Sequence, residues 1–133
     1  MRAISVLTLS SLLLAPTLCG RSRCVLPVAD GGGNKSSRPN IDGTIERVDG
    51  RKIVVRLKKQ AKGRSPTVAL ALPLSAEIFG VYGGAVDEDE LLPGQRVWIW
   101  LEGCGQLNGR AKDRIAVMEL ASTRPGDDFP SEH

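Results

Sequence analysis

The residues best suited to bind a ligand are a run of cations in the first half of the chain. Between residues 51 and 64 seven lysines and arginines occur without one acidic residue, on a predicted strand and the loop that follows it. Cations gathered on one surface bind phosphates or acidic sugars, because binding releases counterions. An ordinary solvated surface fits the same composition. The residues that we assign to the ligand surface are Arg56, Lys58, Lys59 and Lys62.

Two tryptophans are the second candidate for ligand binding. Trp98 and Trp100 are two residues apart in a predicted strand, so their side chains share one face, opposite Val97, Ile99 and Leu101. If the aliphatic residues fill the core, both indoles lie outside and suit a sugar, a base or a protein partner. The alternative is that the indoles pack under the N-terminal segment or against a short helical turn.

Groups for catalysis or metal binding are scarce. The only histidine is His133, and no two cysteines have the Cys-x-x-Cys spacing. The acidic cluster Asp87–Glu90 lacks the spaced ligands and central glycine of a calcium loop, and it favours the start of a helical turn. Glu77 and Glu102 meet only if folding happens to bring them together. We therefore expect a noncatalytic protein with no metal site and no cofactor.

The N-terminus has the pattern of a secretory signal. Arg2 precedes an apolar run from Ala3 to Ala15, which is shorter than the roughly 20 residues of a membrane-spanning helix. Cleavage after Cys19 or after Gly20 fits the pattern, and so does a lipoprotein signal in which Cys19 is acylated. The sequence therefore predicts a periplasmic or secreted protein, with membrane contact only if Cys19 is lipidated.

Export determines how the remaining cysteines are interpreted. Thiols outside the cytoplasm tend to be oxidised, and processing of the signal leaves Cys24 and Cys104 as the two ordinary thiols. We predict a disulfide between them. The alternative is that Cys24 stays free in a flexible segment.

Composition divides the chain into four parts. Residues 1–19 are the signal, and residues 20–39 are a flexible leader rich in Gly, Ser, Arg and Pro. Residues 40–122 form one domain with a modest core. Residues 123–133 show no apolar periodicity, so we expect a disordered tail. The net charge of +3 is too small to indicate nucleic-acid binding by itself.

Alternating apolar residues in the domain predict strands. Asp49-Gly50 is a hairpin signal, because both residues tolerate the positive φ of a tight turn, and a bulge is expected near Glu46-Arg47. Ser75–Val81 is predicted as a helical turn, and a second short turn is predicted at Asp87–Leu91. The predicted strands are residues 41–48, 52–57, 67–72, 96–101 and 114–120.

Three strands, a short helical connection and a final hairpin follow the order of OB-fold barrels. The stretches IDGTIERVDGRKIVV, ELLPGQRVWIWLEG and RIAVMEL resemble the small exported single-OB domains of bacteria, over about residues 41–120. The resemblance implies an all-β fold, a five-stranded OB-like barrel with a short helical connection between the third and fourth strands. It also implies a bacterial envelope setting, and it carries over no catalytic residue.

These observations predict an exported noncatalytic binding or accessory module of the bacterial cell envelope. A polyanion, a glycan or an envelope protein is the expected partner. The second hypothesis is a structural or assembly component that contacts an envelope protein partner.

Overall fold

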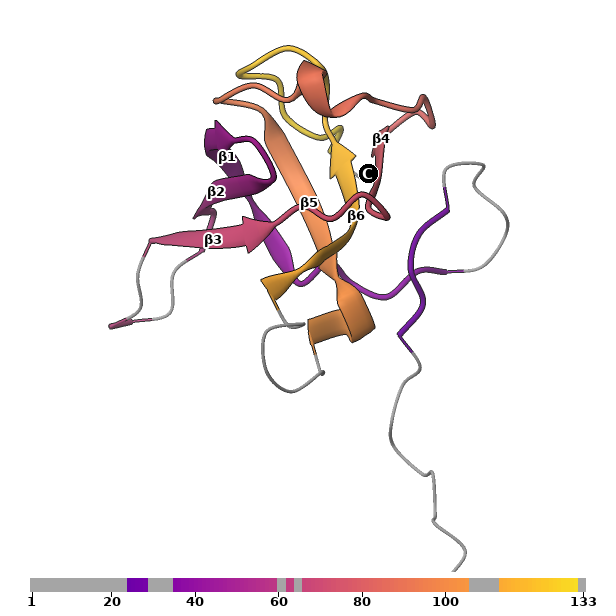
Figure 1. Ribbon diagram of the computed structural model, residues 1–133. Helices are drawn as coiled ribbons and strands as arrows, with labels where there is room; N and C mark the ends of the chain where they lie inside the picture. The colour runs from indigo at the N-terminus through magenta and orange to yellow at the C-terminus, as the bar shows by residue number, and fades with distance from the viewer. Residues whose placement is uncertain (1–23, 29–34, 60–61, 64–65, 106–112, 132–133) are drawn as a thin grey trace, which may run out of the picture.

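The computed structural model describes residues 24–28, 35–59, 62–63, 66–105 and 113–131, which form one mixed β-sheet (Figure 1). The strands are β1 (Ile41–Asp49), β2 (Lys52–Leu57), β3 (Thr67–Ala71), β4 (Glu77–Gly80), β5 (Arg96–Leu101) and β6 (Ile115–Leu120). Their order in the sheet is β3-β2-β1-β5-β6-β4. Neighbouring strands are antiparallel except β4 and β6, which are parallel.

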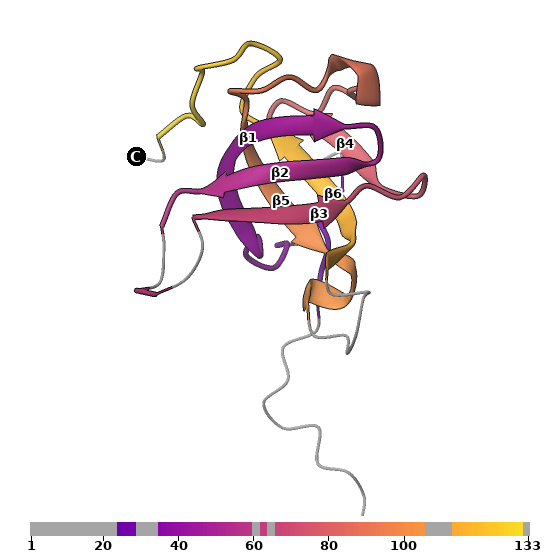
Figure 2. The same ribbon diagram turned by 60° about the vertical axis from the view of Figure 1, so that its left-hand side comes forward.

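The sheet folds back on itself, so that β1, β2 and β3 lie across β5 and β6 (Figure 2). Inward-facing aliphatic residues from both layers form one core, in which Ile53, Val55, Ile99 and Met118 have no exposed surface. Burying one such side chain contributes roughly 1.5–3 kcal/mol, so the alternating residues hold the two layers together.

The β1–β2 hairpin confirms the predicted bulge and the position of the turn to within one residue. The register shifts between Ile45 and Arg47, where the bulge was expected. The last pair is Asp49 with Lys52, so Gly50 is the first turn residue, one position later than predicted. Its φ of +55° is a conformation that glycine adopts without steric cost.

The predicted helical turn at Ser75–Val81 is wrong. Residues 77–80 form β4, which pairs with β6 and places Ile78 opposite Met118. β-branched and aromatic residues such as Ile78 and Phe79 favour a strand once a partner strand is present. That partner lies far along the chain, so a local pattern does not reveal it.

The fold is all-β as predicted, but a five-stranded closed barrel with a helix is not what forms. β4 is a sixth strand, and the sheet stays open between its edge strands β3 and β4. One parallel bridge, between Ala71 and Arg114, brings the end of β3 to the start of β6. A second bridge, between Phe79 and Ala85, covers the outer edge of β4 and so protects it from pairing with other chains.

Among the described residues η1 (Glu88–Glu90) is a regular 3-10 turn, whereas η2 (Glu102–Gly105) departs from helical geometry because Gly103 and Cys104 have positive φ. The first lies within the short turn predicted at Asp87–Leu91. The Glu90 carboxylate accepts a hydrogen bond from the Asp87 N–H at 2.9 Å, which is the helix-start role expected of the acidic cluster.

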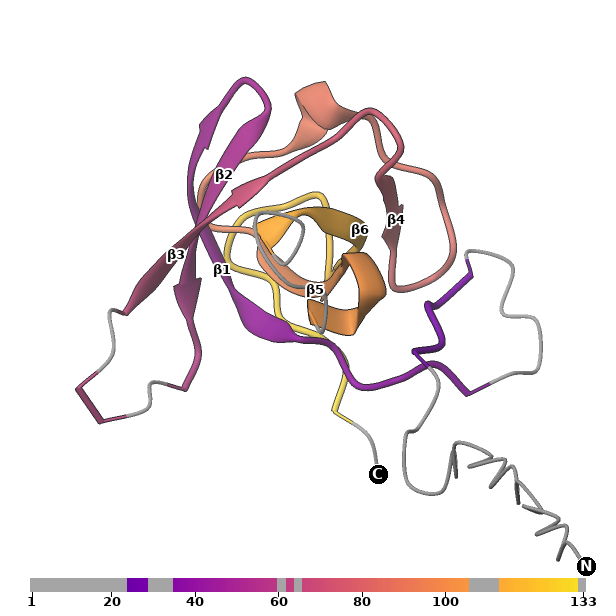
Figure 3. The same ribbon diagram turned by 60° about the horizontal axis from the view of Figure 1, so that its bottom comes forward.

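β1 belongs to both layers of the sheet, because it pairs with β2 along one edge and with β5 along the other (Figure 3). Gly43 lies at the centre of this arrangement, opposite Leu57 on one side and Val97 on the other. A Cβ atom on Gly43 would lie 2.2 Å from the carbonyl oxygen of Arg56. The close approach of the β2 backbone therefore requires glycine here.

Candidate functional site

The first of two candidate sites, the one that contains the two tryptophans, lies on the outer face of β4, β5 and β6, opposite the main core. Trp100, Val117 and Phe79 form a second buried cluster on this face, and Trp98 packs against it. The prediction that both indoles face away from the aliphatic core of β5 is thus correct. The described parts of the leader and of the tail cover this face, and they determine how much of each indole is exposed.

Trp100 lies under the leader, which is one of the two arrangements expected from the sequence. Its side chain is 2% exposed, and its Nε1 donates a hydrogen bond to the Ser37 carbonyl at 2.7 Å. Ser37 is in turn paired with Val25, since the Ser37 N–H donates to the Val25 carbonyl at 2.8 Å. Trp100 therefore offers no free surface to a ligand and serves as an anchor for the leader.

Cys24 and Cys104 form the predicted disulfide, with their Cα atoms 5.6 Å apart. Cys104 has a φ of 54°, which is uncommon for a residue with a side chain, and it lies between two glycines that also have positive φ. Asn40 holds this turn, because its Nδ2 donates to the Cys104 carbonyl at 2.8 Å and its Oδ1 accepts from Leu101. The leader is thus joined to the end of β5 covalently and by hydrogen bonds.

Trp98 is half-buried under the C-terminal tail. The ring of Phe129 stacks on the indole with a centroid distance of 3.8 Å and an interplanar angle of 5°. The Arg96 guanidinium also lies 5.8 Å from the centre of the Phe129 ring. Stacking on the indole and a nearby cation both favour a ring at this position.

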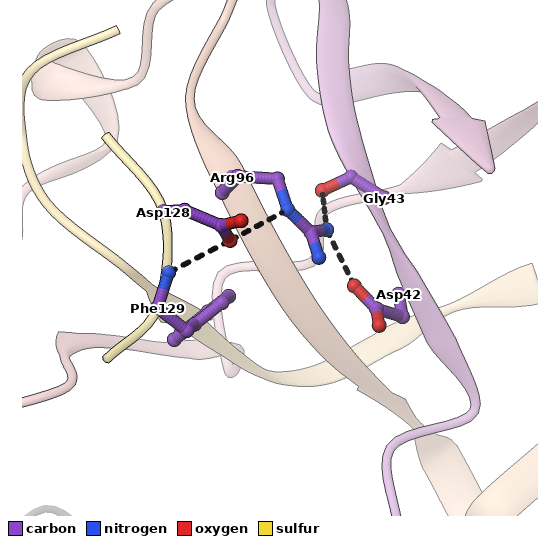
Figure 4. Close-up of polar contacts among 5 residues, drawn as sticks. All are labelled: Asp42, Gly43, Arg96, Asp128 and Phe129. Atoms are coloured by element: carbon purple, nitrogen blue, oxygen red, sulfur yellow. Dashed lines mark hydrogen bonds and ion pairs between the residues drawn. The ribbon is translucent and has the colours of Figure 1, made fainter. Parts of the chain in front are cut away.

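Arg96 connects the tail to β1 (Figure 4). Its Nε donates to Asp128 at 3.1 Å, and its Nη1 donates to Asp42 and to the Gly43 carbonyl. The Phe129 N–H donates to the same Asp128 carboxylate at 2.8 Å. The hydrogen bond from the Phe129 N–H is the largest of the effects that lower the pKa of Asp128. The hydrogen bond from Arg96 and the positive charges of Arg96 and Lys58 lower this pKa further.

The tail backbone is bound just before β5. The side-chain amide of Gln95, which is fully buried, donates from Nε2 to the Thr123 carbonyl at 2.9 Å. The Gly126 N–H donates to the Gly94 carbonyl at 3.0 Å. The part of residues 123–133 that the structure describes therefore follows a defined path over the domain.

The predicted cationic residues do not all lie in one environment. Arg56 points outward and pairs with Glu46 at 2.9 Å, so its charge is already matched. Lys58 and Lys59 are exposed and line a cavity of about 370 Å³ together with Asn40 and Asp42. Lys62 is exposed in the loop after β2.

The acidic residues of η1 lie beside the β1–β2 hairpin. Glu88 pairs with Arg51 at 2.9 Å, and Asp87, Glu88 and Asp89 line a cavity of about 970 Å³. Within the described part of the chain, no group of three or more acidic, cysteine or histidine side chains is arranged to hold a metal ion. The cluster is accounted for by its hydrogen bond and ion pair.

Glu119 is the one carboxylate of the outer face whose pKa is raised, and partial burial is the cause. It lies opposite Trp98 on β5 and Phe79 on β4. We expect Glu119→Gln to raise the free energy of unfolding at pH 7 by less than about 1 kcal/mol, since a half-exposed group is screened.

The direction of this change in the free energy of unfolding follows from the proton that Glu119 binds. The folded state binds this proton more tightly than the unfolded state, so the stability that the protonated form contributes is fully present below about pH 4.5 and is lost as pH rises through the raised pKa. The gain of Glu119→Gln should therefore disappear in acid. Denaturant unfolding at pH 4 and 7 measures it, with the exposed Glu77→Gln as the matched control. An equal effect of both variants at pH 7 would contradict this account.

Most of the contacts that fix the tail are made by residues that were not among the predicted site residues. Arg96, Gln95, Asp128 and Phe129 fix the tail on β5. One signal was available, because Phe129 is the only aromatic residue after Trp100. An aromatic residue in an otherwise polar tail indicates that the tail has a place to dock.

The predicted signal at residues 1–19, including Cys19, lies outside the described residues, and so does part of the leader. No helix in the described ranges has the length and apolar character to cross a membrane. The Cys24–Cys104 disulfide fits an oxidising compartment. Compared with family models, with curated proteins and with solved structures, the chain matches none.

Proposed function

We propose that the protein is an exported noncatalytic binding module of the bacterial cell envelope. Its ligand surface in this proposal is the lysine cluster, which we define as Lys58, Lys59 and Lys62. The ligand is a polyanion, either an acidic glycan or a nucleic acid. The disulfide supports the exported setting, because such bonds persist outside the cytoplasm.

The observation that carries the proposal is that the lysine cluster makes no ion pair with the described residues. Five arginines of the described residues are in ion pairs, whereas no lysine in these ranges is in one. Free ammonium groups at the end of β2 attract phosphate, sulfate or carboxylate groups. The neighbouring cavity of about 370 Å³ gives Lys58 and Lys59 a concave surface on which an anionic group can lie.

The arrangement of the strands supports an OB-type relationship, which belongs to the same proposal. The order β3-β2-β1-β5-β6 and the parallel bridge from Ala71 to Arg114 are consistent with a partly open OB barrel that β4 extends. OB-folds use the face of their second and third strands for oligonucleotides and oligosaccharides. The lysine cluster lies at the end of β2 and in the loop that leads to β3.

The experiment is a salt titration of polyanion binding. We expect the wild-type chain to bind heparin or single-stranded DNA at low salt, and the triple change Lys58→Gln, Lys59→Gln and Lys62→Gln to lower the slope of log K against log salt by about 1 per lysine. Preference for heparin over DNA identifies a glycan, and the reverse a nucleic acid. Fluorescence anisotropy measures both.

The matched control removes three positive charges elsewhere. Arg47→Gln, Lys52→Gln and Arg124→Gln give the same change in net charge away from the lysine cluster. The control should retain the wild-type slope. Equal slopes for the two triple variants, or no binding at low salt, would contradict the proposal.

A further inference from the structure

Residues 94–98, which lead into β5 and form its first part, contact four different chemical features of the tail at once. The Trp98 indole stacks on the ring of Phe129, and Arg96 donates a hydrogen bond to the carboxylate of Asp128. The Gln95 amide donates to a backbone carbonyl of the tail, and the Gly94 carbonyl accepts from a backbone N–H of the tail. A peptide presents all four of these groups: an aromatic ring, a carboxylate, a backbone carbonyl and a backbone N–H.

The groups that make these contacts are fixed by the domain and not by the tail. The Arg96 side chain is 13% exposed and is held by Asp42 and the Gly43 carbonyl of β1. The Gln95 amide accepts from the Leu92 N–H at 2.9 Å and donates to the Glu90 carbonyl at 3.1 Å. A surface whose side chains are already oriented binds without the cost of ordering them.

The end of the tail that carries Asp128 and Phe129 is open to solvent. The Asp128 side chain is 66% exposed although Arg96 is only 13% exposed, so water reaches the carboxylate and screens this ion pair. Residues 123–128 are exposed along their whole length, and Phe129 is half-buried. The ring lies on the face opposite the main core, so its departure leaves that core intact.

We propose that this surface, Gly94 to Trp98, is a docking site for an acidic–aromatic peptide segment of a partner protein, and that residues Asp128 and Phe129 occupy it in the free protein. The partner segment places a carboxylate beside Arg96 and a flat aromatic ring on Trp98. A tethered occupant has an effective concentration in the millimolar range, so it excludes weak competitors and admits a partner that binds more tightly. This site uses none of the residues of the lysine cluster, although the charge of Lys58 acts on Asp128, and it goes beyond the proposed function.

The experiment uses the full chain and a peptide with the sequence of residues 124–131, RPGDDFPS, as the probe. Phe129→Ala removes the ring that covers Trp98. Asp128→Asn removes the charge that pairs with Arg96 and should also release the tail. We expect the peptide to bind the Phe129→Ala chain at least tenfold more tightly than the wild type, because the wild-type tail competes. Iodide quenching reports the site, with Trp98 becoming accessible and the buried Trp100 serving as the internal reference.

Two controls test the chemistry of the site. A peptide with alanine in place of its phenylalanine should not bind, and Trp98→Ala in the Phe129→Ala chain should abolish binding of the intact peptide. The site is contradicted if the peptide binds neither tail variant at millimolar concentration, or binds wild type and variants equally. Displacement of the tail by heparin and not by peptide would identify a glycan site and overturn the peptide assignment.

A second copy of the chain is the remaining occupant to test. Analytical ultracentrifugation of the wild type should show a monomer over the concentrations used for peptide binding. A dimer that forms with rising concentration and disappears in Phe129→Ala would show that the tail docks on another copy, which contradicts a separate partner.

Discussion

Removal of the Cys24–Cys104 disulfide should lower the free energy of unfolding by up to about 4.5 kcal/mol on the chain-entropy model. The bond joins residues 80 positions apart, and so it restricts most of the unfolded chain. The change is Cys24→Ala together with Cys104→Ala, which leaves no free thiol at either position. For a domain of this size the melting temperature should fall by about 10 °C or more, measured by calorimetry.

The same variant should release the leader from Trp100. Without the covalent link, the leader is held by the hydrogen bond from Trp100 Nε1 to Ser37 and by the packing around it. We expect iodide to quench Trp100 in the variant and not in the oxidised wild type. The oxidised wild type and the same protein after reduction make the control pair. An unchanged melting temperature with a protected Trp100 would show that the disulfide neither stabilises the fold nor holds the leader on Trp100.

Gly43→Ala should destabilise the fold by about 3 kcal/mol, at the upper end of the usual cost of overpacking. The added Cβ would lie 2.2 Å from the Arg56 carbonyl oxygen and 2.7 Å from the Val55 side chain. The Arg56 carbonyl belongs to the backbone and cannot rotate away as a side chain can, so β2 must move away from β1. The movement also disturbs Arg96, whose Nη1 donates to the Gly43 carbonyl.

Gly84→Ala is the matched control for Gly43→Ala. A Cβ atom on Gly84 meets nothing within 4 Å, and its φ is not positive, so the stability should stay within about 0.5 kcal/mol of wild type. Urea unfolding measures both variants. Equal stabilities would show that the two strands separate without cost at this position.

Local patterns in the sequence determined most of the strands and the pairing between neighbours in the chain. β2 and β5 begin and end at the predicted residues, because alternation of residues such as Ile53 and Val55 sets both the strand and its buried face. The β1–β2 hairpin follows from a turn residue that tolerates positive φ. The disulfide followed from parity and compartment, since only two thiols remain after the predicted processing.

The tertiary structure alone decided what depends on partners distant in the chain. β4 is a strand and not a helical turn because β6 lies beside it, and a four-residue segment carries too little pattern to reveal that pairing. The sequence places Trp98 and Trp100 on one face, but the leader covers one indole and Phe129 the other. The covering of a surface depends on where the chain ends return in space, and residue spacing holds no information on that.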